Sequence, residues 1–216
     1  MPTPAAADAS PGASGHGAPF EETHSLSPGK ILRDEPFEPE VLSSAVGFEG
    51  AVWNVLDERV KYGDGQIRRQ YVAHPGAVAV VALDDQERVL LIQQYRHPIR
   101  HRDWELPAGL LDIPGEDPMD AARRELAEEA DVTAERWERL VSSWTTPGGN
   151  DELIHIHLAT GISAAKTAHA RADEEADIRV EWVPLSDAVE AVLDGRMRNG
   201  ILSIGILAAA AKRARC

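Results

Sequence analysis

The chain has 216 residues, enough for one compact domain or a core domain with a small appendage, and its net charge of −14 argues against nucleic acid or an anionic membrane as the main partner. Its lone cysteine, Cys216, is the last residue, so no internal disulfide can form and the composition is compatible with a reducing cytoplasm. No apolar run approaches the roughly 18 residues of a membrane-spanning helix, and no basic and apolar leader begins the chain, so we expect a soluble, cytoplasmic protein.

The N-terminal part of the chain changes character twice. Residues 1–19 are mostly Ala, Pro, Gly and Ser without periodicity, a composition that cannot bury enough apolar surface to become ordered, so we expect a disordered tail. Residues 20–47 remain rich in Pro and Glu and are expected to lie across the domain surface. Residues 50–60 and 66–74 then show strand patterns on either side of the glycine-bearing turn "KYGDG", which predicts a β hairpin.

Strand patterns continue through the middle of the chain. Residues 76–85 and 88–95 are apolar throughout, as strands buried on both faces of a sheet are, and residues 102–109 predict a short strand that runs into a loop. The remaining expected elements are strands at 137–144, 152–160 and 178–185 and helices at 186–193, with Ser186 as N-cap, and at 201–214. Strands on both sides of one central helix, with two helices at the end, predict a mixed α/β sandwich.

The central helix lies within the segment "GLLDIPGEDPMDAARRELAEEADV". Asp117 is its expected N-cap, and Pro118 follows at N1, where the missing N–H does no harm. Asp120 adds a favourable negative charge to the first turn. The expected apolar stripe, which would pack on a sheet, consists of Met119, Ala122, Leu126 and Ala130.

Three glutamates, Glu125, Glu128 and Glu129, lie within an arc of about 100° beside that stripe. Like charges at this spacing repel by about 0.2–0.5 kcal/mol per pair, and the end of a helix favours cations instead. One interpretation is a solvated acidic face, in which Arg124 pairs with Glu128. The other is a site for a hard divalent cation, because carboxylates are the ligands that Mg²⁺ and Mn²⁺ prefer. Glu125 and Glu129 have only each other at helical spacing, which favours the metal site.

Gly109, Glu116 and "RELAEE" (124–129) resemble the Nudix hydrolase signature, G-x5-E-x7-R-E-U-x-E-E-x-G-U, in which U is aliphatic. The chain departs from it at two places. Six residues rather than five separate Gly109 from Glu116, and Asp131 replaces the glycine that follows the glutamates and ends the helix in the family. The resemblance implies a Nudix-type α/β/α sandwich with a mixed sheet.

Blocks outside the signature resemble bacterial ADP-ribose pyrophosphatases, especially actinobacterial ones: "GAVAVVALDD", "LLIQQYRH", "WELPAGLLD", "TTPGGNDE" and "EEADIRVEWVPL". Pro147, about fifteen residues after the signature, matches a marker of that subfamily. The resemblance implies hydrolysis of the diphosphate bond of ADP-ribose to AMP and ribose 5-phosphate. It also implies a homodimer in which an N-terminal segment and hairpin, residues 20–75, is swapped between subunits, while residues 76–216 form the Nudix domain.

The resemblance also assigns the metal site. It implies Mg²⁺, with Mn²⁺ as an alternative ion, held by the backbone carbonyl of Ala108 and the side chains of Glu125, Glu128 and Glu129. Glu116 would pair with Arg124 and orient these ligands from outside. The metal would neutralise the diphosphate charge and lower the pKa of a water that attacks phosphorus.

Other roles fall outside the helix. The resemblance places the general base on the loop "DEEAD", with Glu175 preferred and Glu174 next, whereas the residues alone indicate a solvated acidic turn. It also implies that Arg96 contacts phosphate, that Arg69 lies near the adenine, and that Trp53 stacks on the base. Plain core packing is the alternative for Trp53.

Three alternatives remain open. The chain could be a Nudix diphosphatase for another nucleoside diphosphate sugar or a dinucleotide. It could be a non-catalytic ADP-ribose sensor, although the signature glutamates remain and the net charge is acidic. The acidic face could also be purely structural. His155 and His157 share one face of a strand, and the polar outer face of a half-buried strand explains them without a site.

Overall fold

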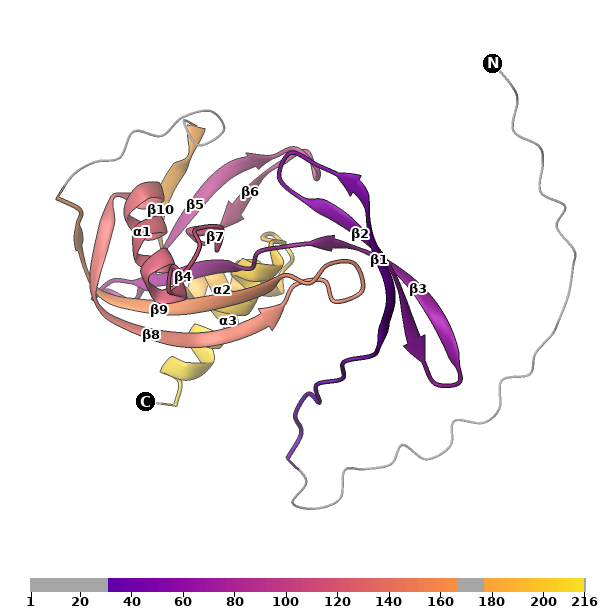
Figure 1. Ribbon diagram of the computed structural model, residues 1–216. Coiled ribbons are helices and arrows are strands. Elements are labelled where there is room, and N and C mark those ends of the chain that lie inside the picture. The colour runs from indigo at the N-terminus through magenta and orange to yellow at the C-terminus, as the bar shows by residue number, and fades with distance from the viewer. Residues whose placement is uncertain (1–30, 167–176, 216) are drawn as a thin grey trace, which may run out of the picture. The chain divides into compact units, whose positions relative to one another are not determined.

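The computed structural model describes residues 31–166 and 177–215 (Figure 1). The expected tail, residues 1–19, and Cys216 lie outside these ranges. Within them the chain forms ten strands and three helices. Residues 31–38 belong to a separate N-terminal unit and contain no helix or strand; the elements below all belong to the unit that begins at Pro39.

A three-stranded antiparallel sheet comes first in the chain, in the order β1-β2-β3. Its strands are β1 (Val41–Glu49), β2 (Asn54–Tyr62) and β3 (Gly65–Ala73). The last two form the expected hairpin, and Gly63 supplies the positive φ of 58° that the tight turn requires. Residues 41–47, which were expected to lie across the domain surface, form most of β1, a strand that the sequence did not predict. Every residue of β1 is exposed, so the strand is held by backbone pairing and lacks the burial pattern that would reveal it in the sequence.

A seven-stranded mixed sheet follows, in the order β10-β5-β4-β9-β8, with β6 beside β5 and β7 beside β4. β4 and β9 are parallel, and the other neighbours are antiparallel. The strands are β4 (Ala77–Leu83), β5 (Arg88–Arg96), β6 (His101–Glu105), β7 (Ala108–Leu110), β8 (Val132–Trp144), β9 (Leu153–Ala164) and β10 (Arg179–Pro184). β8 starts earlier than expected and contains a register shift between Arg139 and Val141, which breaks the alternation that sequence patterns rely on.

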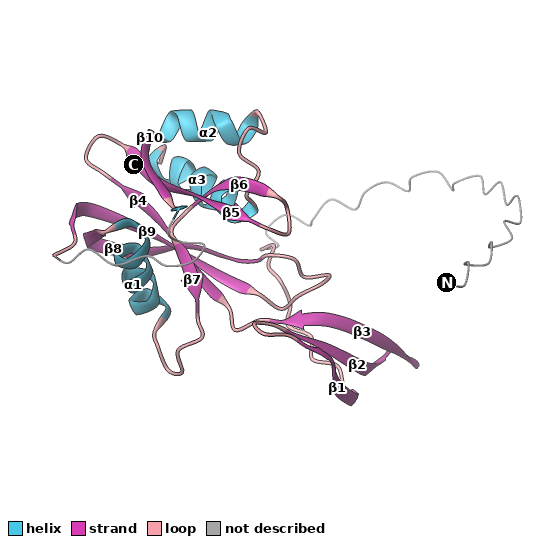
Figure 2. Ribbon diagram, turned by 90° about the horizontal axis from the view of Figure 1, so that it is seen from above, coloured by secondary structure: helices cyan, strands magenta, loops and turns pink. Residues whose placement is uncertain are grey.

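Three helices cover this sheet: α1 (Pro118–Ala130), α2 (Leu185–Leu193) and α3 (Gly200–Arg213). α1 covers one face, and α2 and α3 cover the other (Figure 2). Alternate residues of β4 divide between the two layers, because Val80 packs with Leu126 of α1 whereas Val81 packs with Ile206 of α3. The expected α/β/α sandwich with a mixed sheet is confirmed. No helix in the described ranges is long and apolar enough to span a membrane.

α1 begins and ends where the sequence indicates. The Asp117 side chain accepts a hydrogen bond from the Met119 N–H at 2.8 Å, and Pro118 is the first helical residue. Asp131 ends the helix in the left-handed conformation, with φ 54° and ψ 32°, and its N–H bonds to the Ala127 carbonyl. Aspartate tolerates this conformation better than most residues, so Asp131 does here what glycine does in the family signature.

The packing face of α1 differs slightly from the expected stripe. Ala122, Leu126 and Ala130 are buried, but Met119 is only half-buried and Ala121 is buried in addition. The buried stripe therefore includes Ala121 rather than Met119, and α1 packs against β4, β7 and β8.

The start of α2 corrects a second expectation. The helix begins at Leu185, after Pro184, and Ser186 is not its N-cap because its hydroxyl bonds to the Asp187 carboxylate instead. α3 has a side-chain cap, in which Asn199 accepts from the Leu202 N–H at 2.9 Å.

Candidate active site

α1 approaches β7 most closely at Gly109. A Cβ atom added at this position would overlap the Glu125 carboxylate, so glycine is what allows that side chain to lie on the strand. The preceding residue, Ala108, also contacts α1: its N–H donates to Glu129 Oε2 at 2.8 Å. Only 6% of Glu129 is exposed, and this bond satisfies a carboxylate oxygen that burial takes out of water. We call this contact of Glu125 and Glu129 with Ala108 and Gly109 the α1–β7 junction.

Arg124 supplies the positive charge that the crowded glutamates need. Its Nε and Nη2 bond to the two Glu116 oxygens at 3.1 and 3.0 Å. Its Nη1 lies 2.6 Å from Glu125 Oε1 and 3.2 Å from Glu128 Oε2. The hydrogen bond with Arg124 lowers the pKa of Glu116, and in turn raises the pKa of the guanidinium. One arginine thus holds together three of the carboxylates that the sequence assigns to the site.

The carboxylate oxygens of Glu125, Glu128 and Glu129 are of the kind that bind Mg²⁺, as is a backbone carbonyl such as that of Ala108, whose N–H bonds to Glu129. Across the described ranges, however, no three acidic, histidine or cysteine side chains are already arranged around a common metal position. Arg124 bonds to Glu125 and Glu128, so a cation that binds both would compete with its Nη1. The residues fit a hard divalent cation in chemistry, and Arg124 holds two of them, Glu125 and Glu128.

A second arginine from the sequence prediction, Arg96, lies at the end of β5. Its Nε and Nη2 bond to the two oxygens of Glu105 at 2.8 and 2.7 Å, and the Gln94 amide donates to the same carboxylate at 3.1 Å. Only 5% of the surface of Glu105 is exposed. Sequence reasoning missed Glu105 and Gln94. The sequence signal for this pair is one carboxylate, Glu105, at the end of the short expected strand and directly before "LPAG".

Trp53 is half-buried and stacks on His74, with ring centroids 4.4 Å apart and an angle of 21° between the rings. His74 Nε2 lies 3.5 Å from Glu152 Oε1, and the His74 backbone N–H donates to Asp151 at 2.7 Å. These contacts tie Trp53 to the loop between β8 and β9. Sequence reasoning missed His74, because nothing in a single sequence links positions 74 and 152.

Arg69 lies on the exposed part of β3 and donates to the Arg68 carbonyl at 2.9 Å. Between the described parts of the chain, no hydrogen bond or ring contact joins Arg69 or Trp53 to α1. Glu174 and Glu175 lie outside the described residues. The structure therefore brings together the signature residues with Ala108, and leaves Arg69 and Trp53 apart from them.

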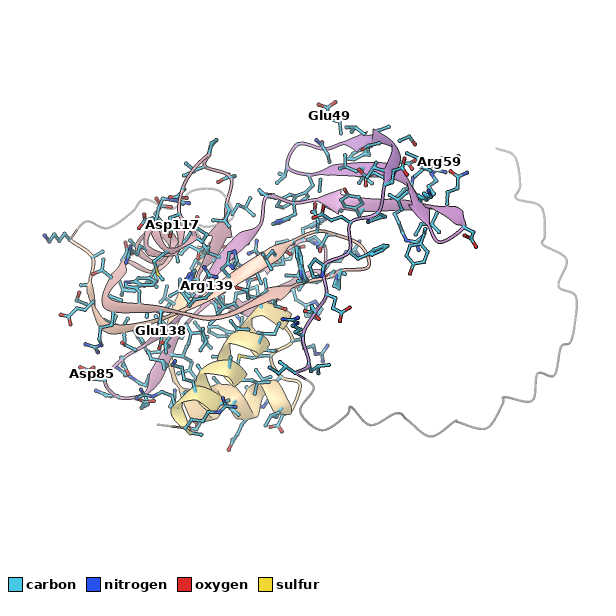
Figure 3. The ribbon with its side chains drawn as sticks, turned by 60° about the horizontal axis from the view of Figure 1, so that its bottom comes forward. Glu49, Arg59, Asp85, Asp117, Glu138 and Arg139 are labelled. Carbon is cyan, nitrogen blue, oxygen red and sulfur yellow. The ribbon has the colours of Figure 1, made fainter. Side chains whose placement is uncertain are left out.

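One of the two histidines of β9, His157, corrects another expectation. His157 is 1% exposed and lies in register with Val80, on the face that α1 covers, so this is not a polar outer face. Its Nδ1 has no hydrogen-bond partner among the described residues. Burial lowers the pKa of His157 most, His155 and Arg139 lower it further, and Asp117 opposes them. Figure 3 labels Asp117 at the start of α1 and Arg139 on β8.

Residues 73–202 match the family described as the NUDIX domain. The chain belongs to the Nudix family. This Nudix chain is 42% identical over 170 residues to the "ADP-ribose pyrophosphatase" of Mycobacterium tuberculosis, with 78% of this chain and 82% of the relative covered. It is 36% identical over 171 residues to the "Methanol dehydrogenase activator" of Bacillus methanolicus, with 79% and 91% covered.

A solved structure described as an "ADP compounds hydrolase" has the same Nudix fold, with a TM-score of 0.68 and 19% identity over 82% of this chain and 95% of that one. The family and the fold predicted from the sequence are thereby confirmed, and the chain is a Nudix hydrolase. Hydrolases of this family generally use divalent metal ions.

Proposed function

We propose that this Nudix hydrolase cleaves the diphosphate bond of ADP-ribose to give AMP and ribose 5-phosphate. The observation that carries the proposal is the α1–β7 junction, where carboxylates of the signature helix lie against the backbone of Ala108 and Gly109. ADP-ribose is favoured as the substrate because the relative from Mycobacterium tuberculosis is named for it and shares 42% of its aligned residues.

The proposed ligands of the metal are the Ala108 carbonyl and the side chains of Glu125, Glu128 and Glu129. Mg²⁺ is the proposed ion, with Mn²⁺ as a substitute; when bound it supplies charge neutralisation on the diphosphate and a water of lowered pKa. Glu116 has the role of keeping Arg124 at the site when Nη1 gives up its contacts with the ligands, because it bonds through the other two guanidinium nitrogens.

The general base in this proposal is Glu175, with Glu174 as the alternative. Arg96 would contact phosphate from the end of β5. A general base contributes about 10²–10⁴-fold to a rate, so Glu175→Gln and Glu174→Gln should differ by that factor in kcat.

Trp53 and Arg69 complete the proposed site from a second copy of the chain. Two observations support a homodimer. No contact among the described residues brings either side chain to α1 within one chain. The strand β1 also leaves Val46 and Phe48 exposed by 55% and 64%, as an interface strand would before association. In this arrangement residues 20–75 form the dimerisation segment and residues 76–216 the hydrolase domain.

The experiment that tests the proposal is AMP release from ADP-ribose in the presence of Mg²⁺, beside ADP-glucose and NADH as competing substrates. We expect ADP-ribose to be preferred, EDTA to abolish the activity, and Glu129→Gln to lower it by more than about 100-fold, the upper end for residues that act outside the ligand shell. Glu138→Gln is the matched control, because Glu138 lies on β8 and pairs with Lys212.

The alternatives predict different outcomes of this experiment. Preference for ADP-glucose or NADH would retain the metal-dependent chemistry and reassign the substrate. Tight binding of ADP-ribose without product from any substrate would refute the proposed hydrolase activity and indicate that the chain is an ADP-ribose sensor. Activity that Glu129→Gln leaves intact would show that the acidic face of α1 is structural.

A further inference from the structure

The Glu105 carboxylate is buried, and its partner Arg96 reaches the surface. The side chain of Glu105 is 7% exposed, whereas that of Arg96 is 41% exposed. A buried carboxylate is costly unless its oxygens are hydrogen-bonded. Both oxygens of Glu105 are bonded to Arg96, and Gln94 adds a third bond. The buried side chains thus hold a guanidinium group that lies partly in solvent.

The strand register explains why these three side chains meet. Glu105 pairs with Ile92 across β5 and β6, and Ile92 packs in the core layer beneath α1. Because alternate residues of a strand share a face, Gln94 and Arg96 follow Ile92 on the α1 side of the sheet. Arg96 itself pairs with His101 at the far end of β6, so its side chain runs back along that strand to reach Glu105.

This face is also the face of the α1–β7 junction. β6 ends at Glu105 and β7 begins at Ala108, whose N–H bonds to Glu129 of α1. One short segment of chain therefore carries both the carboxylate that holds Arg96 and the backbone that contacts the acidic helix. β5 and β6 lie side by side in both ribbon views (Figures 1 and 2).

We propose that Glu105 is a positioning residue that fixes the Arg96 guanidinium for contact with a phosphate group of the substrate. The inference rests on the proposed function, which brings a diphosphate to this face. Glu105 binds the edge formed by Nε and Nη2, and the fork of a guanidinium has a second bidentate edge, formed by Nη1 and Nη2, that suits phosphate oxygens. Because the arginine is already held in one conformation, it loses less rotational freedom when substrate binds.

Stability alone is a weak reason for such a pair. Apolar residues of similar volume in place of a buried ion pair are often neutral or stabilising. The chain also offers a matched pair at the other end of β5, where Arg88 bonds to Asp84 at 2.7 and 2.6 Å and the arginine is 39% exposed. Asp84→Asn therefore serves as a control that removes an arginine–carboxylate pair at the β4–β5 turn, where Asp84 also accepts backbone hydrogen bonds from Gln86 and Arg88.

The first test monitors the Arg96 side chain directly and does not require the enzyme to turn over a substrate. The Nε–H resonance of Arg96 is followed by NMR while ADP is added in the presence of Mg²⁺. We expect ADP to shift this resonance, and Glu105→Gln to broaden it and to weaken ADP binding by about 10-fold, the lower end for residues that orient another group. Asp84→Asn should leave the Arg96 resonance and the affinity for ADP unchanged. An Arg96 resonance that ADP does not move would overturn the inference.

The second test is a double-mutant cycle in the kinetics of ADP-ribose hydrolysis. Glu105→Gln should raise KM more than it lowers kcat, and should have no further effect in an Arg96→Ala background, because the arginine it positions is gone. An equal loss in both backgrounds would show that Glu105 acts independently of Arg96 and would overturn the inference. If the wild type does not hydrolyse ADP-ribose, the proposed function is wrong, and the ADP titration still decides the role of Glu105.

Discussion

The two sheets of this Nudix hydrolase are stabilised in different ways. Every residue of β4, at the centre of the seven-stranded sheet, is buried between α1 on one face and α2 and α3 on the other. Every residue of β1, at the edge of the three-stranded sheet, is exposed. β4 is stabilised by burial of apolar area, whereas β1 is held by backbone pairing with β2.

This difference also separates the two groups of proposed site residues. The α1–β7 junction is part of the buried sheet, so close packing fixes the carboxylates of α1 relative to the backbone of Ala108. Trp53 lies in the connection between β1 and β2 of the three-stranded sheet, and its ring stacks on His74. The residues proposed to bind metal thus lie on the buried sheet, and the residues proposed to contact adenine lie on the sheet proposed to meet a second copy of the chain.

Gly109→Ala is the change expected to have the largest effect on activity. The added Cβ would overlap the Glu125 carboxylate and push it away from the strand. We expect kcat/KM to fall by more than about 100-fold, because the side chain proposed to bind metal is displaced. Gly200→Ala is the control, since a Cβ there meets no atom within 4 Å and the position is helical. Steady-state kinetics with ADP-ribose measure the difference, and unchanged kinetics for Gly109→Ala would show that the close contact is unimportant.

Leu126→Ala should have the largest effect on stability. Leu126 is fully buried between α1 and the seven-stranded sheet, so truncation should cost about 2–5 kcal/mol in the free energy of unfolding. Urea denaturation measures this cost. A loss below about 1 kcal/mol would mean that α1 packs far less tightly than the sheet beneath it indicates.

The buried histidine of the seven-stranded sheet predicts a dependence of stability on pH. Burial lowers the pKa of His157, so the folded protein disfavours the charged form. Below about pH 6.5 the unfolded chain binds a proton that the folded chain does not, and stability therefore falls as the pH falls toward the folded pKa, by at most about 1.4 kcal/mol per pH unit for one histidine. Urea denaturation at several pH values should show that the free energy of unfolding depends less steeply on pH for His157→Gln than for the wild type. The exposed His101, changed to Gln, is the control, and an equal change in slope for both variants would contradict the prediction.

Phe48→Ser on the exposed sheet should have the smallest effect on the stability of a single chain. Phe48 is 64% exposed, so its substitution should change the free energy of unfolding by less than about 0.5 kcal/mol. The same change should weaken the proposed homodimer, because it removes apolar area from an open sheet face. Analytical ultracentrifugation of both proteins over a range of concentrations separates the two effects. Identical association would exclude this face as the interface.

Some features of this protein are local enough for the sequence alone to determine. The capped start of α1 at Asp117 and Pro118, the hairpin of β2 and β3, and the burial of β4 on both faces follow from residues close together in the chain. The resemblance of Gly109, Glu116 and "RELAEE" to the Nudix signature predicted the family correctly, because that signature also lies within one short stretch of the chain.

Only the tertiary structure decided how distant segments meet. It placed Glu105 against Arg96 through the register of β5 and β6, and it buried His157 because α1 covers that face of β9. It also showed β1 as a strand, since pairing with β2 needs no apolar pattern. Local propensity and periodicity describe one element at a time, whereas strand register and helix packing depend on contacts between residues far apart in the chain.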